Sequence, residues 1–384
     1  MITHSTPKAA LSALFAACLL AACGGSDDAL ESRITAVKVV GDSLSDSGTY
    51  GFKFTVQGTA ATGAGSTTIW PEYVAANYRQ TLCAHYASSN QITYSRNAAC
   101  GNYAVAAARI NHVTAPTSPL SITQQLKDAG SAGFSAGDLL LIDGGANDLA
   151  DLVGAYLGAA SDGGQAYGAL LSTVLDPVAV RTALGAGAGG LVQIGAAYAK
   201  TLAVQFASTI QSQALAKGAT RVAVLNSPAI TKTPEFQMIL GSIAAAGGAN
   251  GAQAAAAAEV LFDGWVKVFN AQLADSLAGD ARVVVVDFYA SMTDQVANPA
   301  KYQITNATTP TCPVTGVNEK GLPTYTFPTC TAASLSAMAA PQGASGGADW
   351  WKSYGFADGF HPTPYFHKLM GDLVSRSLVQ AGWR

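Results

Sequence analysis

Three residues near opposite ends of the chain carry the side chains that nucleophilic catalysis requires. Ser43 follows the apolar run of residues 37–40, and Asp358 stands three residues before His361. A serine becomes a nucleophile when a base takes its proton, and a histidine serves best as that base when a carboxylate fixes its ring. An acid three residues before its histidine can reach the ring nitrogen that faces away from the serine. The pattern predicts Ser43 as nucleophile, His361 as base and Asp358 as the group that orients the base.

Asn147 is a fourth candidate, in the turn of residues 143–148 that follows the apolar run 139–142. An asparagine in a glycine-rich turn is commonly only a turn former. Its side-chain amide is also a good neutral donor to the negative oxygen of a tetrahedral intermediate, and one such donor contributes about 3 to 4 kcal/mol of transition-state stabilisation. We favour the second interpretation and expect Asn147 in an oxyanion hole.

The segment Gly41-Asp42-Ser43-Leu44 is by itself a weak signal, because Asp-Ser after a strand is also an ordinary helix N-cap. It is not the Gly-x-Ser-x-Gly turn of α/β-hydrolases, since Ser45 takes the place of the second glycine. If a helix begins here, the free amides of its first turn can also donate to an oxyanion. A cap and a catalytic turn are both compatible with these residues.

The elements between these residues predict the frame that positions them. Four apolar, β-branched runs bounded by turn residues indicate buried strands, and their continuous hydrophobicity favours a parallel sheet covered on both faces. Helical stretches alternate with them, which predicts a doubly wound, three-layer α/β/α domain whose ligands bind beyond the carboxyl ends of the strands. The predicted strands are residues 37–40, 139–143, 221–225 and 282–287, and the predicted helices include residues 71–80, 121–128, 191–217, 253–277 and 365–379.

One irregular segment, residues 298–347, interrupts this frame and contains six prolines. A loop of this length is usually functional or disordered. Because it directly precedes the Asp358 segment and contains two cysteines, we expect an ordered flap at the mouth of the site. The aromatic residues that follow it either line an acyl pocket or pack the flap, and we favour the pocket. These residues are Trp350, Trp351, Tyr354 and Phe356.

The N-terminus has the features of an export signal in residues 1–22: Lys8 precedes an apolar stretch that is too short to span a bilayer comfortably. Its end, Leu-Ala-Ala-Cys with Cys23 last, resembles a bacterial lipobox. That resemblance implies an acylated Cys23 and anchoring at the outer membrane, since Gly24 follows the cysteine. Ordinary cleavage, giving a periplasmic or secreted protein, is the alternative. Residues 23–33 are then a tether, and residues 34–384 form a single domain.

Four cysteines remain beyond Cys18 and Cys23, in a compartment where disulfides persist. Of the three possible connectivities, the most economical joins each cysteine to its nearest neighbour in sequence. A metal site is the rival interpretation, but neither pair has the short Cys-x-x-Cys spacing of zinc ligands, and few histidines lie near. We expect no metal and no cofactor. The expected pairs are Cys83 with Cys100 and Cys312 with Cys330.

Composition narrows the class of partner. The chain has 384 residues, enough to bury a large core, but only 12% are charged and the net charge is -3. Binding a phosphate backbone requires a basic surface, so nucleic acid is an unfavourable partner.

Four blocks along the chain are similar, in order, to those of the GDSL or SGNH hydrolase family, and within it to the bacterial lipase and esterase branch. One block alone is compatible with chance, whereas four in the right order are a strong signal. The resemblance implies a flavodoxin-like arrangement of the sheet. The blocks are residues 41–48, 102–105, 145–148 and 358–363.

The resemblance also implies a role for each site residue. Ser43 is the nucleophile and supplies one oxyanion amide, Asn147 supplies a second donor, and His361 with Asp358 forms the base and its orienter. The remaining donor in this family is the backbone amide of a glycine, and Ala107 stands at that position here. An alanine keeps the N–H, demands ordinary φ and ψ angles, and slightly narrows the pocket.

We therefore expect a carboxylic ester hydrolase that acts on a small-molecule or lipid ester through an acyl-serine intermediate. Acyl transfer by the same site is the nearest alternative, and a non-catalytic surface lipoprotein that binds a partner is the rival from another class. The other histidines outside the signal, His85, His112 and His367, are expected to be structural or solvated.

Overall fold

The computed structural model describes Met1, residues 33–59 and residues 67–383. The predicted signal peptide, the lipidation site Cys23 and the tether lie outside the described residues, apart from Met1 and Arg33.

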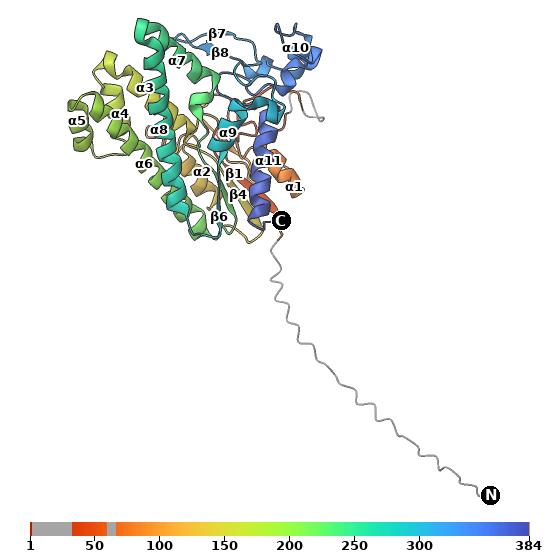
Figure 1. The fold of residues 1–384 in the computed structure, drawn as a ribbon. Helices are drawn as coiled ribbons and strands as arrows, with labels where there is room; N and C mark the ends of the chain where they lie inside the picture. Colours follow the sequence, from red (N-terminus) through yellow and green to blue (C-terminus); the bar gives the residue numbers. More distant parts are fainter. Residues whose placement is uncertain (2–32, 60–66, 384) are drawn as a thin grey trace. The chain divides into compact units, whose positions relative to one another are not determined.

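Four parallel strands form the central sheet, in the order β1-β4-β5-β6 (Figure 1). In register, Val40 lies opposite Ile142, and Leu225 lies opposite Val286. The carboxyl ends of all four strands therefore reach the same edge of the sheet. The strands are β1 (Ala36–Val40), β4 (Asp138–Ile142), β5 (Val222–Leu225) and β6 (Val283–Val286).

An extended segment at Asn102 lies along the free edge of β1. The amide of Val39 donates to the carbonyl of Gly101 at 2.9 Å, and the amide of Tyr103 donates to the carbonyl of Val39 at 2.7 Å, in a parallel pairing. The chain thus passes from β1 to a neighbour on one side and then to β4 on the other side. This reversal places a switch point at the end of β1, where doubly wound sheets bind their ligands.

Alternate strand residues face opposite helical layers, as the geometry of a strand requires. Val40 and Ile142 pack against α2, α3, α6 and α8, with α4, α5 and α7 on the same side. Val39 and Leu141 pack against α1, α9 and α11. The helices are α1 (Trp70–Asn77), α2 (Ile122–Ala129), α3 (Ala146–Asp162), α4 (Gln165–Leu171), α5 (Pro177–Gly185), α6 (Ala188–Gln213), α7 (Pro234–Ala246), α8 (Gly251–Leu277), α9 (Phe288–Ala297), α10 (Ala332–Ala337) and α11 (Pro364–Gln380).

The predicted three-layer fold class is confirmed, and each predicted strand forms within one residue of its expected bounds. Helix α3 is the main element that the sequence did not predict. It begins directly after Gly145, whose φ of 98° lies in the left-handed region that glycine adopts freely. A Cβ at Gly145 would lie 2.7 Å from the ring of Phe269. The glycine-rich turn expected around Asn147 is therefore the first turn of a helix.

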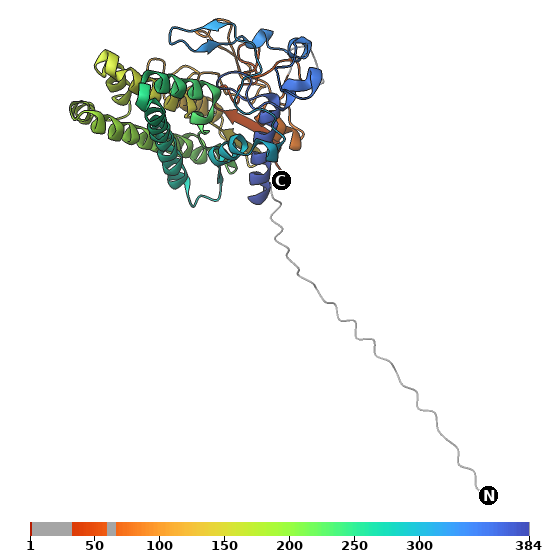
Figure 2. The same ribbon diagram turned by 45° about the horizontal axis from the view of Figure 1, so that its top comes forward.

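The insertion of residues 298–347 contains several short elements and the Cys312–Cys330 disulfide. Figure 2 shows β7, β8 and α10 together at the top of the view, on the same side of the domain. The second predicted disulfide, Cys83–Cys100, is also formed. The strands of the insertion are β7 (Gly316–Val317) and β8 (Pro323–Thr324), and a separate two-stranded ribbon consists of β2 (Tyr86–Ala87) and β3 (Ser95–Arg96).

Most of the aromatic residues after the insertion pack against it, which is the interpretation that the sequence favoured less. Trp351 also lines a hollow of about 480 Å³, whose lining includes no residue of the predicted relay. Trp350, Trp351 and Tyr354 are only 3 to 4% exposed and pack in one cluster with Phe327 of the insertion. Phe356 lines a cavity of about 20 Å³, which has room for a water molecule and not for an acyl chain. The burial of these apolar side chains helps to stabilise the insertion, which has little regular structure.

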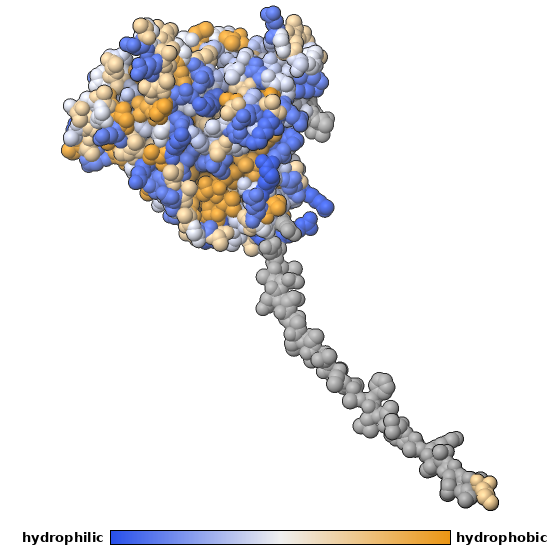
Figure 3. Space-filling view, in the orientation of Figure 1, coloured by the Kyte–Doolittle hydropathy of each residue, from blue (hydrophilic) through white to orange (hydrophobic). Residues whose placement is uncertain are grey.

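The last strand, β6, forms one edge of the sheet, and its residues Val283, Val284 and Val285 are only partly buried. Figure 3 shows apolar atoms gathered between α8 and α11, where this strand lies. None of the described helices combines the length and apolar character needed to cross a bilayer.

Candidate active site

Ser43 lies in a tight turn directly beyond β1. The carboxylate of Asp42 accepts a hydrogen bond from the amide of Leu44 at 3.0 Å, and its carbonyl accepts one from the amide of Ser45 at 3.1 Å. No helix begins at this point, because residues 42–45 form a turn and the first helix of the described residues starts at Trp70. The helix N-cap expected as one possibility is therefore wrong, and the amide of Ser43 is presented by a turn.

A buried pair of carboxyl groups fixes this turn against the end of β4. Ser45 Oγ donates to Asp143 Oδ1, and a Cβ at Gly41 would lie only 1.7 Å from the same oxygen, so only glycine fits there. Burial raises the pKa of Asp42, and burial together with the charge of Asp42 raises the pKa of Asp143 well above its ordinary value. The pair is thus stable when it holds a proton, because two adjacent buried carboxylates repel each other.

The three predicted catalytic side chains meet in a continuous relay. His361 Nε2 lies 2.8 Å from Ser43 Oγ, and His361 Nδ1 lies 2.9 Å from Asp358 Oδ2. Asp358 Oδ1 also accepts hydrogen bonds from the amides of Phe360 at 2.8 Å and His361 at 2.6 Å. The carboxylate therefore folds the turn that carries the histidine and orients its ring at the same time.

The charges of this pair support each other. Burial alone would raise the pKa of Asp358, but attraction to His361 and the hydrogen bonds that Asp358 accepts lower it below its ordinary value. Burial alone would lower the pKa of His361, but the charge and hydrogen bond of Asp358, with smaller contributions from Asp42 and Glu235, raise it. The site thus favours an ionised Asp358 beside a histidine that accepts a proton readily.

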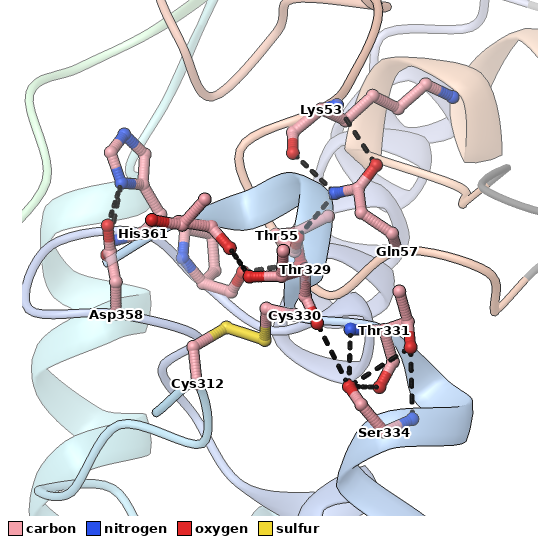
Figure 4. The surroundings of a disulfide bond; sticks show 12 residues. Lys53, Thr55, Gln57, Cys312, Thr329, Cys330, Thr331, Ser334, Asp358 and His361 are labelled. Atoms are coloured by element: carbon pink, nitrogen blue, oxygen red, sulfur yellow. Dashed lines mark hydrogen bonds and ion pairs between the residues drawn. A yellow bond between two sulfur atoms is a disulfide. The ribbon is translucent and has the colours of Figure 1, made fainter. Parts of the chain in front are cut away.

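Aromatic rings and the insertion hold His361 in place. The ring centroids of Phe54 and Phe327 lie 5.2 Å and 5.5 Å from that of His361. Cys312 donates its amide to the carbonyl of Ala357 at 2.8 Å, next to Asp358. Figure 4 shows the disulfide of Cys312 beside the Asp358–His361 pair. The insertion therefore borders the candidate catalytic residues, as the sequence predicted for this segment.

After His361 the chain is anchored by the start of α11. Thr55 Oγ1 donates to the carbonyl of Pro362 at 2.8 Å. Thr363 caps the helix by accepting from the amide of Phe366 at 3.3 Å, and Pro364 occupies the first helical turn. A fixed backbone on both sides keeps the imidazole ring in one orientation.

Asn147 and Ala107 lie where the ends of α3 and of the Asn102 segment meet. Asn147 Nδ2 donates to the carbonyl of Ala108 at 3.0 Å. Ala107 has φ of 64°, in the left-handed region, so the expectation of ordinary backbone angles is wrong. This conformation costs a residue with a Cβ on the order of 1 kcal/mol or more.

Three polar contacts impose that strained backbone. The amide of Ala106 donates to Asp46 Oδ2 at 2.9 Å, Arg109 Nη1 donates to the carbonyl of Ala107 at 2.5 Å, and the amide of Ile110 donates to Asp148 Oδ2 at 3.1 Å. Among the described residues, the amides of Ser43 and Ala107 donate to no protein acceptor. Both amides are free to donate to a ligand oxygen.

Asp46, Arg109 and Asp148 are the positioning residues that the sequence did not predict. Asp148 joins α3 to the Ala107 loop and therefore fixes the separation of two candidate oxyanion donors. Burial raises its pKa to about 7. Arg109 forms two hydrogen bonds with Asp151, at 2.7 and 3.0 Å. The only local feature of the sequence that could have indicated a positioning residue was the acidic residue directly after Asn147.

The remaining histidines lie away from the relay. His85 is buried, with its ring 4.1 Å from that of Tyr103, and His367 is fully buried in α11, where burial lowers its pKa to about 3. His112 is half-buried. Within residues 33–59 and 67–383, no three His, Cys, Asp or Glu side chains converge as metal ligands do.

Comparison with known protein families finds a match that covers most of the chain. Residues 37–374 match the family described as GDSL-like lipase/acylhydrolase, a span that includes every candidate residue of the relay and of the oxyanion hole. A comparison with curated proteins finds no match. The family supports a general lipase or esterase type of activity on ester substrates and names no particular ester.

Proposed function

The chain belongs to the GDSL-like lipase/acylhydrolase family, and on that premise we propose that it hydrolyses carboxylic esters through an acyl intermediate on Ser43. The observation that carries the proposal is the relay of Ser43 Oγ, His361 and Asp358, with separations of 2.8 and 2.9 Å. These separations are within the range in which a base can take the proton of a nucleophile.

In the proposed mechanism, His361 Nε2 takes the proton of Ser43 Oγ as that oxygen attacks the ester carbonyl carbon. The resulting oxyanion accepts hydrogen bonds from the amides of Ser43 and Ala107 and from Asn147 Nδ2. His361 then gives its proton to the leaving alcohol, and the acyl group stays on Ser43. A water molecule loses a proton to His361 and attacks the acyl carbon, and Ser43 recovers its proton as the acid leaves. Asp358 remains ionised throughout.

The test uses p-nitrophenyl esters of several acyl lengths and a serine-reactive phosphonate. We expect turnover and stoichiometric labelling of Ser43, and we expect Ser43→Ala to lower kcat by about 10⁴-fold or more and to abolish labelling. Ser131→Ala, at an exposed serine beyond α2, is the matched control. Absence of both turnover and labelling contradicts the proposal and favours a non-catalytic binding lipoprotein.

Acyl transfer to an alcohol is a second candidate, favoured by the aromatic rings of Phe54 and Phe327 that pack against His361. Apolar cover over the base disfavours water relative to a larger alcohol. Adding an alcohol acceptor to the same assay and measuring the ratio of new ester to free acid separates the two reactions.

We propose further that the protein is exported and anchored by a lipid on Cys23. The two disulfides, Cys83–Cys100 and Cys312–Cys330, support an oxidising compartment. Mass spectrometry of the mature N-terminus tests the proposal: a diacylated Cys23 is expected, and Cys23→Ser is expected to lose it while Cys18→Ser keeps it. An N-terminus beginning at another residue contradicts lipidation.

A further inference from the structure

A groove lies between α3 and α7, and the tip of the β7–β8 hairpin covers it. Its volume of about 820 Å³ lies in the range of sites for small molecules. Most of its lining is apolar, and two of its three charged side chains, Glu319 and Lys320, lie on the exposed hairpin tip. Its apolar walls are Ala150, Val153 and Leu157 of α3 and Phe236, Ile239 and Ile243 of α7.

Both walls of the groove begin at the catalytic centre. Along α3, Ala150, Gly154 and Gly158 follow Asn147 at spacings of three and four residues, so all four lie on one face of the helix. On the other wall, the amide of Glu235 donates to the carbonyl of Gly359 at 2.8 Å, between Asp358 and His361 in sequence. The groove thus extends away from the oxyanion donor.

The cover of the groove belongs to the same disulfide-closed loop that contacts the base. Asn318 Oδ1 accepts from the amides of Lys320 and Leu322 at 2.9 and 3.0 Å, which shapes the tip of the hairpin. Leu322 and Lys320 line the groove, whereas Phe327 of the same loop packs against His361. Figures 1 and 2 show the hairpin reaching over the domain from the side that carries α10.

We propose that this groove binds the acyl chain of the ester, so that the enzyme prefers long, unbranched acyl groups; the inference rests on the proposed hydrolysis at Ser43. When the carbonyl oxygen accepts from Asn147, the carbonyl carbon lies at the head of the α3 face, and the carbons attached to it enter the groove. An uncharged chain suits walls that offer apolar side chains and few polar partners.

Two glycines make the floor of this groove adjustable by mutation. A Cβ at Gly154 meets only Lys320 Nζ, at 3.8 Å, and a Cβ at Gly158 meets nothing within 4 Å. Both lie inside a helix, where glycine is the weaker helix former, so a larger residue fills the groove without opposing the fold. Along the helix axis, Gly154 lies about 10 Å and Gly158 about 16 Å from Asn147.

The test compares kcat/KM for p-nitrophenyl butyrate, laurate and palmitate. In the native enzyme we expect kcat/KM to rise with acyl length, by up to about fourfold per buried methylene. Gly154→Phe is expected to lower the laurate-to-butyrate ratio by about tenfold or more. Gly158→Phe is expected to act mainly on palmitate, because it blocks the groove farther from Asn147. Gly241→Phe, on α7 but outside the groove, is the matched control.

Equal changes for all three esters in Gly154→Phe, or the same ratio change in Gly241→Phe, overturn the acyl groove while hydrolysis stands. The acyl groove is also overturned if kcat/KM depends on the length of the alcohol in a series of alkyl butyrates instead of on the length of the acyl group. A separate measurement needs no turnover: calorimetry of laurate binding to Ser43→Ala, with and without Gly154→Phe. If laurate binds and Gly154→Phe weakens its binding, the groove is supported even when no ester is hydrolysed. The absence of hydrolysis would then contradict only the proposed function.

Discussion

Carboxyl groups around His361 set the pH at which it can act as a base. Burial lowers its pKa, but Asp358, and more weakly Asp42 and Glu235, raise it above 6.5. A general base must be neutral, so kcat/KM is expected to fall as the pH drops through a value above 6.5. The measurement is the pH profile of kcat/KM between about pH 5 and pH 9.

Removing one of these charges is expected to move that profile. Glu235→Gln weakens the attraction for a proton on His361, so the acid limb shifts to lower pH. Glu259→Gln, which removes a carboxylate paired with Lys232 on the surface, is the control and should leave the limb in place. An acid limb at or below 6.5 in the native enzyme contradicts the raised pKa of His361.

The left-handed backbone of Ala107 leads to a prediction about stability. Ala107→Gly is expected to raise the free energy of unfolding by about 1 kcal/mol, because glycine adopts positive φ without a clash at Cβ. Ala106→Gly, at the preceding residue, is expected to lower it by about 0.5 to 1 kcal/mol through added chain entropy. Urea denaturation of both variants checks the pair, and a loss of stability in both contradicts the strain assigned to Ala107.

Side-chain chemistry and a three-residue spacing predicted the pair of Asp358 and His361, whereas Ser43 was a weak signal in its own segment and gained support from the order of the four blocks. The position of Ala107 followed from a resemblance, which supplies a place in the chain and no backbone conformation. Its φ depends on Asp46, Arg109 and Asp148, which reach it from separate segments. Contacts of this kind leave no pattern in a single sequence.

At the scale of elements, the buried strands were predictable because a short, uninterrupted apolar run is favourable only where both faces of a strand are buried. Helix α3 was hidden by the glycines at its start, which resemble a loop. At Ser43 the sequence left a helix cap and a catalytic turn both open, and the structure forms a turn held by Asp42 and Asp143. Short polar segments after strands are therefore ambiguous until the opposing strand end is known.

The two disulfides close loops of similar length, with sequence separations of 17 and 18, but lie in different surroundings. Replacing either pair by serines is expected to lower the free energy of unfolding by about 3 kcal/mol. Only the Cys312 and Cys330 replacement is expected to lower kcat/KM by about tenfold or more, since that loop carries Phe327 onto His361. Equal kinetic losses in both double variants would show that the insertion does not position the base.

At the scale of the whole molecule, the site rests on carboxyl groups that the fold buries. Burial raises the pKa of Asp42, Asp46, Asp143 and Asp148, all within the segments that carry the candidate catalytic residues. Each such group stabilises the folded state below its ordinary pKa and loses that contribution as the pH rises through its folded-state pKa. His367 acts in the opposite direction, since its pKa of about 3 destabilises the fold as the pH falls below 6.5.

Asp148 is the buried carboxyl group whose pH-dependent contribution to stability can be measured. Its pKa of about 7 in the folded protein, against an ordinary value of 3.8, means that the folded state retains a proton that the unfolded chain releases. The stability contributed by this group is therefore lost as the pH rises from about 3.8 to about 7, and most of the loss falls in the window between pH 5 and pH 8. Asp148→Asn keeps an acceptor for the amide of Ile110 and removes the titration, so its stability relative to the native protein should rise by about 2 kcal/mol across that window.

Asp176→Asn, at an exposed helix cap with the same chemistry, should change stability equally at both pH values. The measurement is thermal or urea unfolding at pH 5 and pH 8. If the difference in stability between Asp148→Asn and the native protein is the same at both pH values, Asp148 is ionised throughout and Arg109 compensates its buried charge.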